Sequence, residues 1–220
     1  MMPWRNALAV AIFFLLVGVS SVHAQREFEI TPFGGSRFGG SIGESTAINP
    51  TVSYDNIRIK SSVDYGIWAD YTLFQSFPNL QTEFMWNRQP TELAGYNSLA
   101  NSTTNLASAN LDEFEWGVLY SFRSPEAKIR PYAVGGLGFT HFSTGQLLGF
   151  SNRFSYSLGG GVKYFFANHI GLRLEARWSP THTTTGLATY CDPFYGCYQS
   201  TAANTAQQFQ ANLGIIFRFR

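Results

Sequence analysis

The last stretch of the chain, residues 208–220, carries an apolar side chain at every second position. From Phe209 to Phe219 every second residue is apolar, whereas Gln210, Asn212 and Arg218 lie at positions between them. Successive side chains of a β-strand point to opposite faces, so this pattern predicts a strand with one apolar face. That face needs a cover, which is either other segments of the protein, as in a soluble β-sandwich, or lipid.

The composition of the chain favours lipid as that cover. Charged residues make up 13% of the chain and aromatic residues 16%, whereas soluble domains carry about 25% charged residues. Few charges combined with many aromatic residues are typical of a protein that turns an apolar surface to lipid and keeps its polar side chains inside. The net charge of +1 gives no reason to expect nucleic acid as a partner.

The same alternation recurs along the chain between connections that are in turn long and short. Long polar loops are expected over residues 36–56, 90–111, 143–152 and 179–206, and tight turns lie between the other segments. Long loops on one side and short turns on the other are typical of outer-membrane barrels. We therefore predict an all-β fold, an eight-stranded antiparallel up-and-down transmembrane β-barrel, in which the Gly-rich fifth strand turns Ala133, Leu137 and Phe139 outward. The expected strands are residues 27–35, 57–71, 80–87, 113–122, 129–142, 154–166, 170–178 and 208–219.

The charged residues of these segments share one face, and this fixes which face points inward. An Arg or Lys turned to lipid near the midplane costs about 2–4 kcal/mol, so the charged face must line the lumen. A soluble barrel such as a lipocalin would have the opposite order, apolar inside and polar outside. The lumen of an eight-stranded barrel is only wide enough for side chains to fill, so we expect paired charges and no open diffusion pore. The expected lumen network comprises Arg58, Lys60, Asp64, Asp70, Glu83, Glu113, Glu115, Arg130, Lys163, Arg173, Glu175, Arg177 and Arg218.

The first 24 residues have the features of a secretory signal peptide. Arg5 precedes an apolar core over residues 7–19, and Val22-His23-Ala24 is a cleavage site of the small-x-small kind. The alternative, an uncleaved anchor helix, needs roughly 20 apolar residues. We therefore expect residues 1–24 to be removed and residues 25–220 to form a single barrel domain.

Cys191 and Cys197 are the two cysteines of the chain, and they lie close together in the sequence CDPFYGC. In an exported protein, two nearby cysteines in such a loop are most simply a local disulfide. A metal site would need more ligands, so no metal is expected.

The chain from residue 25 onward resembles the small outer-membrane β-barrel proteins, a family that includes the OmpA-type barrels, OmpX and OmpW. The resemblance rests on FEITPFGGSRFGG, RPYAVGGLGF and SYSLGGGVKYFF, and on a C-terminal barrel-assembly signal formed by Asn212, Gly214, Phe217 and Phe219, after which this chain carries one extra residue, Arg220. It implies export to the bacterial outer membrane. It also implies contact with outer-membrane lipid and lipopolysaccharide, recognition by the barrel assembly machinery, and no cofactor.

One pair of residues suggests an enzyme. His141 and Ser143 lie on the same side of a strand, and they are similar to the His-x-Ser pair of barrel-type lipid A deacylases, in which Ser143 would be the nucleophile and His141 the base. Thr144-Gly145 departs from that family's continuation, and the sequence places no acid beside His141. The Gly clusters at 135–138 and 159–161 lack the GK[ST] of a phosphate loop, so they predict no nucleotide site.

These patterns together predict a protein that is not an enzyme. We expect a structural or surface-interaction role, carried by the extracellular loops, with a partner that the sequence does not identify. The alternative of a different class is a narrow passage or binding barrel for small hydrophobic molecules, which the resemblance to OmpW would allow.

Overall fold

The computed structural model describes residues 27–43, 56–97, 101–144, 150–184, 188–192, 196–200 and 203–220. The predicted signal peptide, residues 1–24, lies outside these ranges. Within them no helix is long and apolar enough to cross a membrane.

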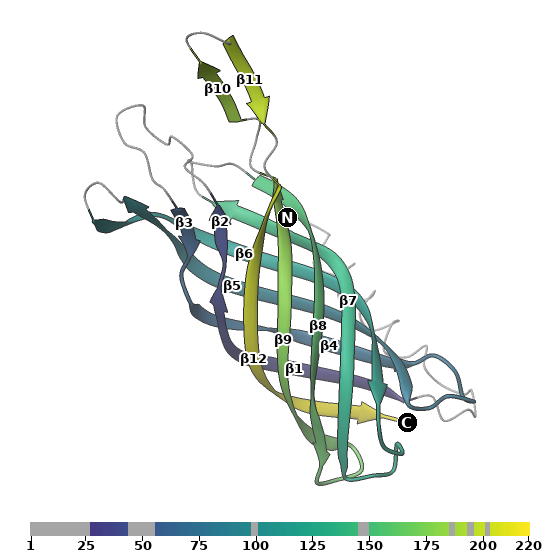
Figure 1. Ribbon diagram of the computed structural model, residues 1–220. Coiled ribbons are helices and arrows are strands. Elements are labelled where there is room, and N and C mark those ends of the chain that lie inside the picture. The colour runs from purple at the N-terminus through teal and green to yellow at the C-terminus, as the bar shows by residue number, and fades with distance from the viewer. Residues whose placement is uncertain are drawn as a thin grey trace, which may run out of the picture.

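The strands form a closed, eight-stranded antiparallel barrel, which confirms the predicted fold class (Figure 1). The order around the sheet is β2-β3-β5-β4-β1-β12-β9-β8-β7-β6, and the pairing of β5 with β6 closes it. At the loop end, the short strand β2 extends β1 and the short strand β3 extends β4, so each pair counts as one strand of the barrel. Strands β10 and β11 form a separate hairpin. The strands are β1 Phe28–Gly39, β2 Ser41–Gly43, β3 Asn56–Ile59, β4 Ser62–Thr72, β5 Leu80–Asn97, β6 Ser102–Ser121, β7 Ile129–Thr144, β8 Phe150–Phe165, β9 Ile170–Thr184, β10 Ala188–Asp192, β11 Gly196–Ser200 and β12 Ala203–Phe219.

Several strands are much longer than a membrane requires. β5 has 18 residues and β6 has 20, whereas a tilted transmembrane strand needs about 9–11. The two pair continuously from Leu80↔Tyr120 to Asn97↔Ser102. The loop predicted over residues 90–111 is therefore wrong. A ladder in water can be polar on both faces, so the extension carries no apolar alternation from which to recognise it.

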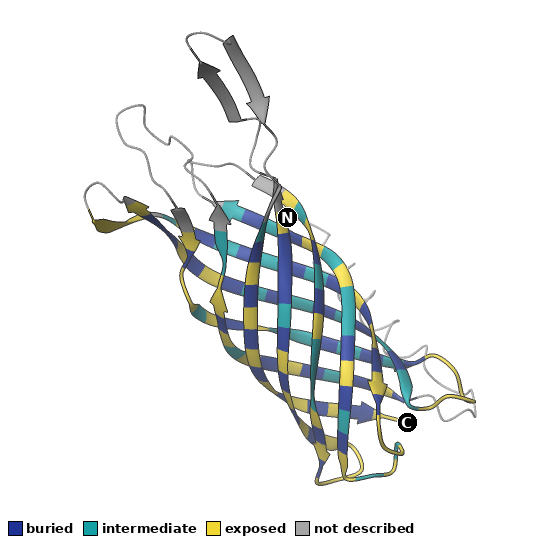
Figure 2. Ribbon diagram, in the orientation of Figure 1, coloured by how far each residue is buried: buried dark blue, intermediate teal, exposed yellow. Residues whose placement is uncertain are grey.

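The outer wall is apolar between two aromatic girdles, and Figure 2 shows the resulting alternation of buried and exposed residues along each strand. Ala133, Leu137 and Phe139 lie on the outer face as predicted, the last two with 62% and 46% exposure. Near the loop end, Phe114 stacks on Phe139 with ring centroids 5.3 Å apart. Such girdles mark the two membrane interfaces. The upper girdle includes Phe38, Tyr65, Trp86, Phe114, Phe139, Phe154 and Phe209, and the lower one includes Phe28, Tyr120, Phe122, Tyr164, Phe166, Phe217 and Phe219.

A β-bulge interrupts the wall where β3 passes into β4. Ile59 pairs with Leu93 and Tyr65 pairs with Arg88, so residues 60–64 face residues 89–92 and the β3–β4 side carries one residue more. An extra residue in one strand reverses which side chains point inward beyond it. Ile59 is accordingly buried, and Arg58 and Lys60 are exposed. The prediction that Arg58 and Lys60 line the lumen is therefore wrong, because it assumed unbroken alternation through the bulge.

If the outer wall faces lipid, the loss of stability caused by an outward-facing Arg should depend on its depth in the membrane. Leu174 is 60% exposed midway along β9, so Leu174→Arg is expected to lower the free energy of unfolding in lipid vesicles by about 2–4 kcal/mol. Ile170→Arg, at the short-turn end of the same strand, is expected to cost only about 0–1 kcal/mol. Urea titration followed by tryptophan fluorescence measures both. Equal costs at the two positions would contradict a lipid-facing wall.

Candidate functional site

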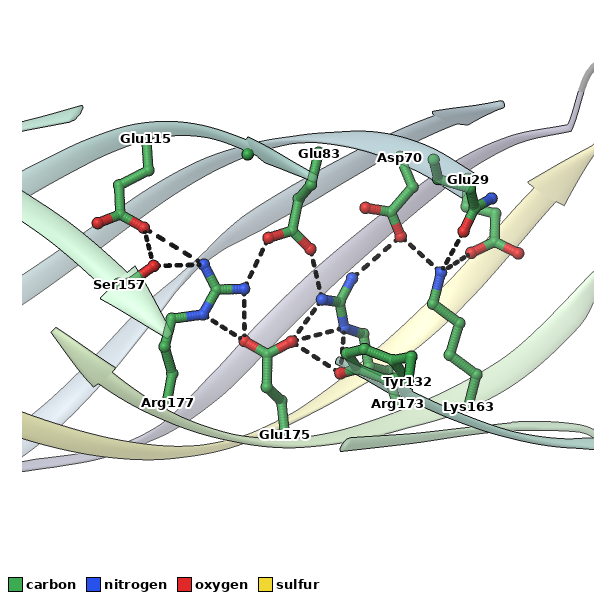
Figure 3. Close-up of polar contacts among 12 residues, drawn as sticks. Glu29, Asp70, Glu83, Glu115, Tyr132, Ser157, Lys163, Arg173, Glu175 and Arg177 are labelled. Atoms are coloured by element: carbon green, nitrogen blue, oxygen red, sulfur yellow. Dashed lines mark hydrogen bonds and ion pairs between the residues drawn. The ribbon is translucent and has the colours of Figure 1, made fainter. Parts of the chain in front are cut away.

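The lumen holds one connected network of ion pairs, which is the most distinctive chemical feature of the protein (Figure 3). Apart from the exposed Arg220, its members are buried acidic and basic side chains from most strands of the barrel. Several of the pairs join side chains from opposite walls and so cross the interior. In order of contact the network runs Glu115, Arg177, Glu83 and Glu175, Arg173, Asp70, Lys163, Glu29, Arg130, Glu27, Arg218 and Arg220.

Arg173 lies at the centre of this network. Its guanidinium pairs with Glu83 and Glu175, and Nη1 lies 3.0 Å from Asp70. Its Nε donates to the hydroxyl of Tyr132 at 2.8 Å. The guanidinium carbon lies 4.2 Å from the centre of the Trp68 ring. A planar guanidinium with five N–H donors suits this crowded arrangement better than the point charge of a lysine.

Lys163 serves the part of the network nearer the short turns. Its Nζ donates to Glu29 at 2.5 Å, to Asp70 at 2.7 Å and to Gln81 at 3.1 Å. Three acceptors match the three N–H donors of the ammonium group. Lys163 is fully buried, so this set of acceptors replaces the water that the ammonium group loses.

An aromatic ring separates two cations at the short-turn end. The guanidinium carbons of Arg130 and Arg218 lie 3.9 Å and 4.0 Å from the centre of the Phe165 ring. Both cations also pair with Glu27, at 3.1 Å and 3.2 Å. Cation–π contacts and the shared carboxylate hold two like charges close together.

The lumen becomes less charged toward the loop end and finishes apolar. Arg37 pairs with Glu113 at 2.7 Å, and Asn87 donates to Asp64 at 3.0 Å and to Gln210 at 2.8 Å. Above them a buried apolar cluster occupies the mouth of the barrel. Its members are Ile59, Leu93, Ala109, Leu111, Phe142 and Ala206.

Eleven of the thirteen residues predicted for the lumen network are buried in the lumen, and Arg58 and Lys60 are not. Sequence reasoning left out Glu27, Glu29 and Arg37. Glu27 and Glu29 alternate with Phe28 and Ile30, so the pattern already placed them on the charged face. Arg37 lies in a Gly- and Ser-rich stretch that was expected to be a loop, and nothing in the sequence marks it as buried.

The residues of the predicted assembly signal and the two cysteines lie outside the ion-pair network. In the assembly-signal stretch, Asn212 and Gly214 lie on the inner face, and Phe217 and Phe219 are exposed outside. Cys191 and Cys197 lie opposite each other in the β10–β11 hairpin. Their disulfide stays a prediction.

His141 lies on the outer face, just beyond the upper aromatic girdle. Its Nδ1 is 2.6 Å from Oδ1 of Asn152, and Asp112 lies directly across the ladder from it. Asp112 is the neighbouring acid that the sequence could not place. In a hydrolytic triad, however, Nδ1 is the nitrogen that the acid holds, and here an amide oxygen occupies that position. Among the described residues, no group of three or more His, Cys, Asp and Glu side chains could hold a metal ion.

Because the network is buried, substituting a single member should lower the free energy of unfolding. Lys163→Met would leave Glu29 and Asp70 without their shared cation, so we expect a loss of about 3–5 kcal/mol in the free energy of unfolding. Lys60→Met breaks the exposed pair with Glu92, at 3.0 Å, and should cost about 0–1 kcal/mol. Urea unfolding in vesicles compares the two. A mild effect of Lys163→Met would mean that water reaches the network.

Comparison with known proteins identifies structures of similar fold and a matching protein family. Solved structures with a similar fold include neisserial surface protein A (12% identity, 88% of this chain and 97% of that chain, TM-score 0.52), a major outer membrane protein of Thermus thermophilus (14%, 88% and 99%, 0.54) and outer membrane protein W of E. coli (15%, 90% and 100%, 0.52). No match was found among curated proteins. The model of the outer membrane protein beta-barrel domain matches residues 12–217. The chain therefore belongs to the outer membrane protein β-barrel family.

Proposed function

We propose that this protein is a non-enzymatic barrel of the bacterial outer membrane whose lumen is closed by ion pairs and whose specific role lies at its extracellular end. The observation that carries the proposal is the ion-pair network. Arg173 on β9 pairs with Asp70 on β4 and Glu83 on β5. Strands β1 and β12 lie between β9 and β4 in the sheet, so these residues are not on neighbouring strands. Such pairs cross the interior and occupy the path that a solute would need.

The burial of the charged groups supports a closed lumen. Arg173 and Lys163 are fully buried, and Glu83 and Arg177 are at most 2% exposed. A hydrated passage would leave such groups in contact with water. Among the described residues, each carboxylate of the network lies within ion-pair distance of at least one cation.

The extracellular end has the surface for an interaction. Strands β5 and β6 continue as a paired ribbon past the girdle, and β10 and β11 form a hairpin beyond β9 and β12 (Figure 1). The aromatic girdles would contact outer-membrane lipid and lipopolysaccharide, and the C-terminal strand would be recognised by the barrel assembly machinery after export. The proposal assigns no enzymatic role to His141, whose Nδ1 contacts Oδ1 of Asn152.

A planar-bilayer recording tests the closed lumen. The wild-type protein is expected to give no conductance above that of the bare bilayer. The double variant Arg173→Ala, Arg177→Ala removes two large side chains from the centre of the network and is expected to give measurable conductance. Steady conductance of the wild-type protein would overturn the proposal.

The apolar cluster at the mouth favours a second candidate, which is binding or passage of small hydrophobic molecules. Leu111, Leu93 and Phe142 form the apolar surface of this cluster, but the charges below it would oppose deeper entry of an apolar molecule. We therefore expect proteoliposomes to take up an apolar fluorescent solute no faster than protein-free liposomes. Faster uptake that is lost in Leu111→Asp would replace the closed barrel with this second candidate.

A further inference from the structure

Three cations lie on the outward face of the barrel at its loop end, namely Arg58, Lys60 and Arg88. Lys60 and Arg88 have side chains 43% and 39% exposed. The other Lys and Arg residues of the described ranges lie in the lumen, on the inward side of the mouth, or at the short-turn end. All three outward cations lie on β3, β5 and the connection from β3 to β4, so this charge is confined to one side of the barrel.

The bulge is the reason that two of them point outward. With unbroken alternation, Arg58 and Lys60 would lie on the same face as Asp64, inside the barrel. The extra residue between Ile59 and Tyr65 turns them to the outside. Bulges often re-aim side chains in this way near functional sites.

The height of the cations matches the membrane interface. Arg88 follows Trp86 by two residues on the same face of β5 and pairs across the ladder with Tyr65. The Tyr65 and Trp86 rings are in edge contact, with centroids 6.4 Å apart. Aromatic girdles sit at the level of lipid headgroups, so the guanidinium of Arg88 lies at or just beyond that level.

A surface cavity of about 410 Å³ lies beside Lys60. It is lined by residues 60–62, 90–92 and 108–110. Ladder pairing between β4 and β5 stops at Tyr65↔Arg88, and the gap above it is bridged by Thr91, whose hydroxyl donates to the Lys60 carbonyl at 2.6 Å. The bulge therefore supplies both the outward cations and a recess beside them.

Two carboxylates lie beside the cations. Lys60 pairs with Glu92 at 3.0 Å, and Asn105 donates to the same oxygen of Glu92. Arg88 pairs with Asp112 through Nε at 3.8 Å, so that pair does not use its terminal Nη1 and Nη2 atoms. Exposed pairs of this kind contribute little stability. Among the described residues, three cations against two carboxylates leave the patch positive, and a phosphate offers a stronger, charge-assisted set of acceptors.

We propose that Lys60 and Arg88 bind a phosphate group on the headgroup of an outer-leaflet glycolipid, with Arg58 adding positive charge above them. The acyl chains of that lipid would lie against Tyr65 and Trp86 on the same outer surface. Continuity between the cationic patch and the lipid-facing wall favours a lipid over a soluble anion. The inference does not depend on whether the lumen is closed.

The test uses the refolded full-length protein in detergent and purified short-core lipopolysaccharide as the probe, with binding measured by native mass spectrometry. The variant Lys60→Gln, Arg88→Gln is expected to bind about tenfold more weakly, since it removes two charge-assisted contacts. The matched control Arg123→Gln, Lys128→Gln removes two exposed cations at the short-turn end and should bind as the wild type does. Lys60→Arg, Arg88→Lys keeps the charges and should retain most of the binding.

Heat-modifiable migration in SDS gels verifies that each variant is folded. Dephosphorylated lipopolysaccharide should bind wild type and the glutamine variant equally. Equal binding of intact lipopolysaccharide by wild type and the glutamine variant, or an equal loss in the control, would overturn the site. Displacement of the lipid by inorganic phosphate at matched concentration would also overturn it, because the patch would then be a site for soluble anions.

Discussion

The need to pair every backbone N–H and C=O group inside lipid governs this structure. An apolar outer wall can face a membrane only if the sheet has no open edge, and the pairing of β5 with β6 removes the edge. Closure with eight strands then fixes the width of the interior. That interior is too narrow for bulk water and too wide for small side chains to fill, and long charged side chains paired across it are one solution.

Burying charged side chains costs free energy of desolvation, which the contacts within the network have to offset. Each buried charge loses its water, and the attraction between two ions repays that loss only if the remaining hydrogen-bonding groups are also satisfied. Arg173 satisfies this condition through three carboxylates and the Tyr132 hydroxyl, and Lys163 does so through three acceptors. The backbone hydrogen bonds specify which strands are neighbours in the sheet. The ion-pair network specifies, in addition, which strands face one another across the lumen.

The bulge between Ile59 and Tyr65 links the inside of the barrel to its outer surface. By reversing which side chains of this strand point inward, it adds Ile59 to the apolar cluster of the mouth and turns Lys60 to the outer surface that also carries Arg88. One inserted residue thus shapes the apolar cluster of the mouth and creates the cationic patch at the level of the headgroups. A regular strand at this position would put Arg58 and Lys60 inside the barrel instead of on its outer surface.

The sequence by itself determined the class of fold, the lipid-facing wall and most of the lumen charges, because these depend on a period of two that each strand displays independently. Glu83 and Lys163 could be assigned to the interior from their immediate neighbours. The facing of Arg58 and Lys60, the burial of Arg37 and the extension of β5 and β6 beyond the membrane could not be derived in this way. Local alternation does not reveal a bulge, which is defined only against the partner strand, and a ladder in water needs no apolar face. Which carboxylate meets which cation was likewise decided only by the tertiary structure, since closure and the stagger of the strands bring together residues such as Glu29 and Lys163 that lie far apart in the sequence.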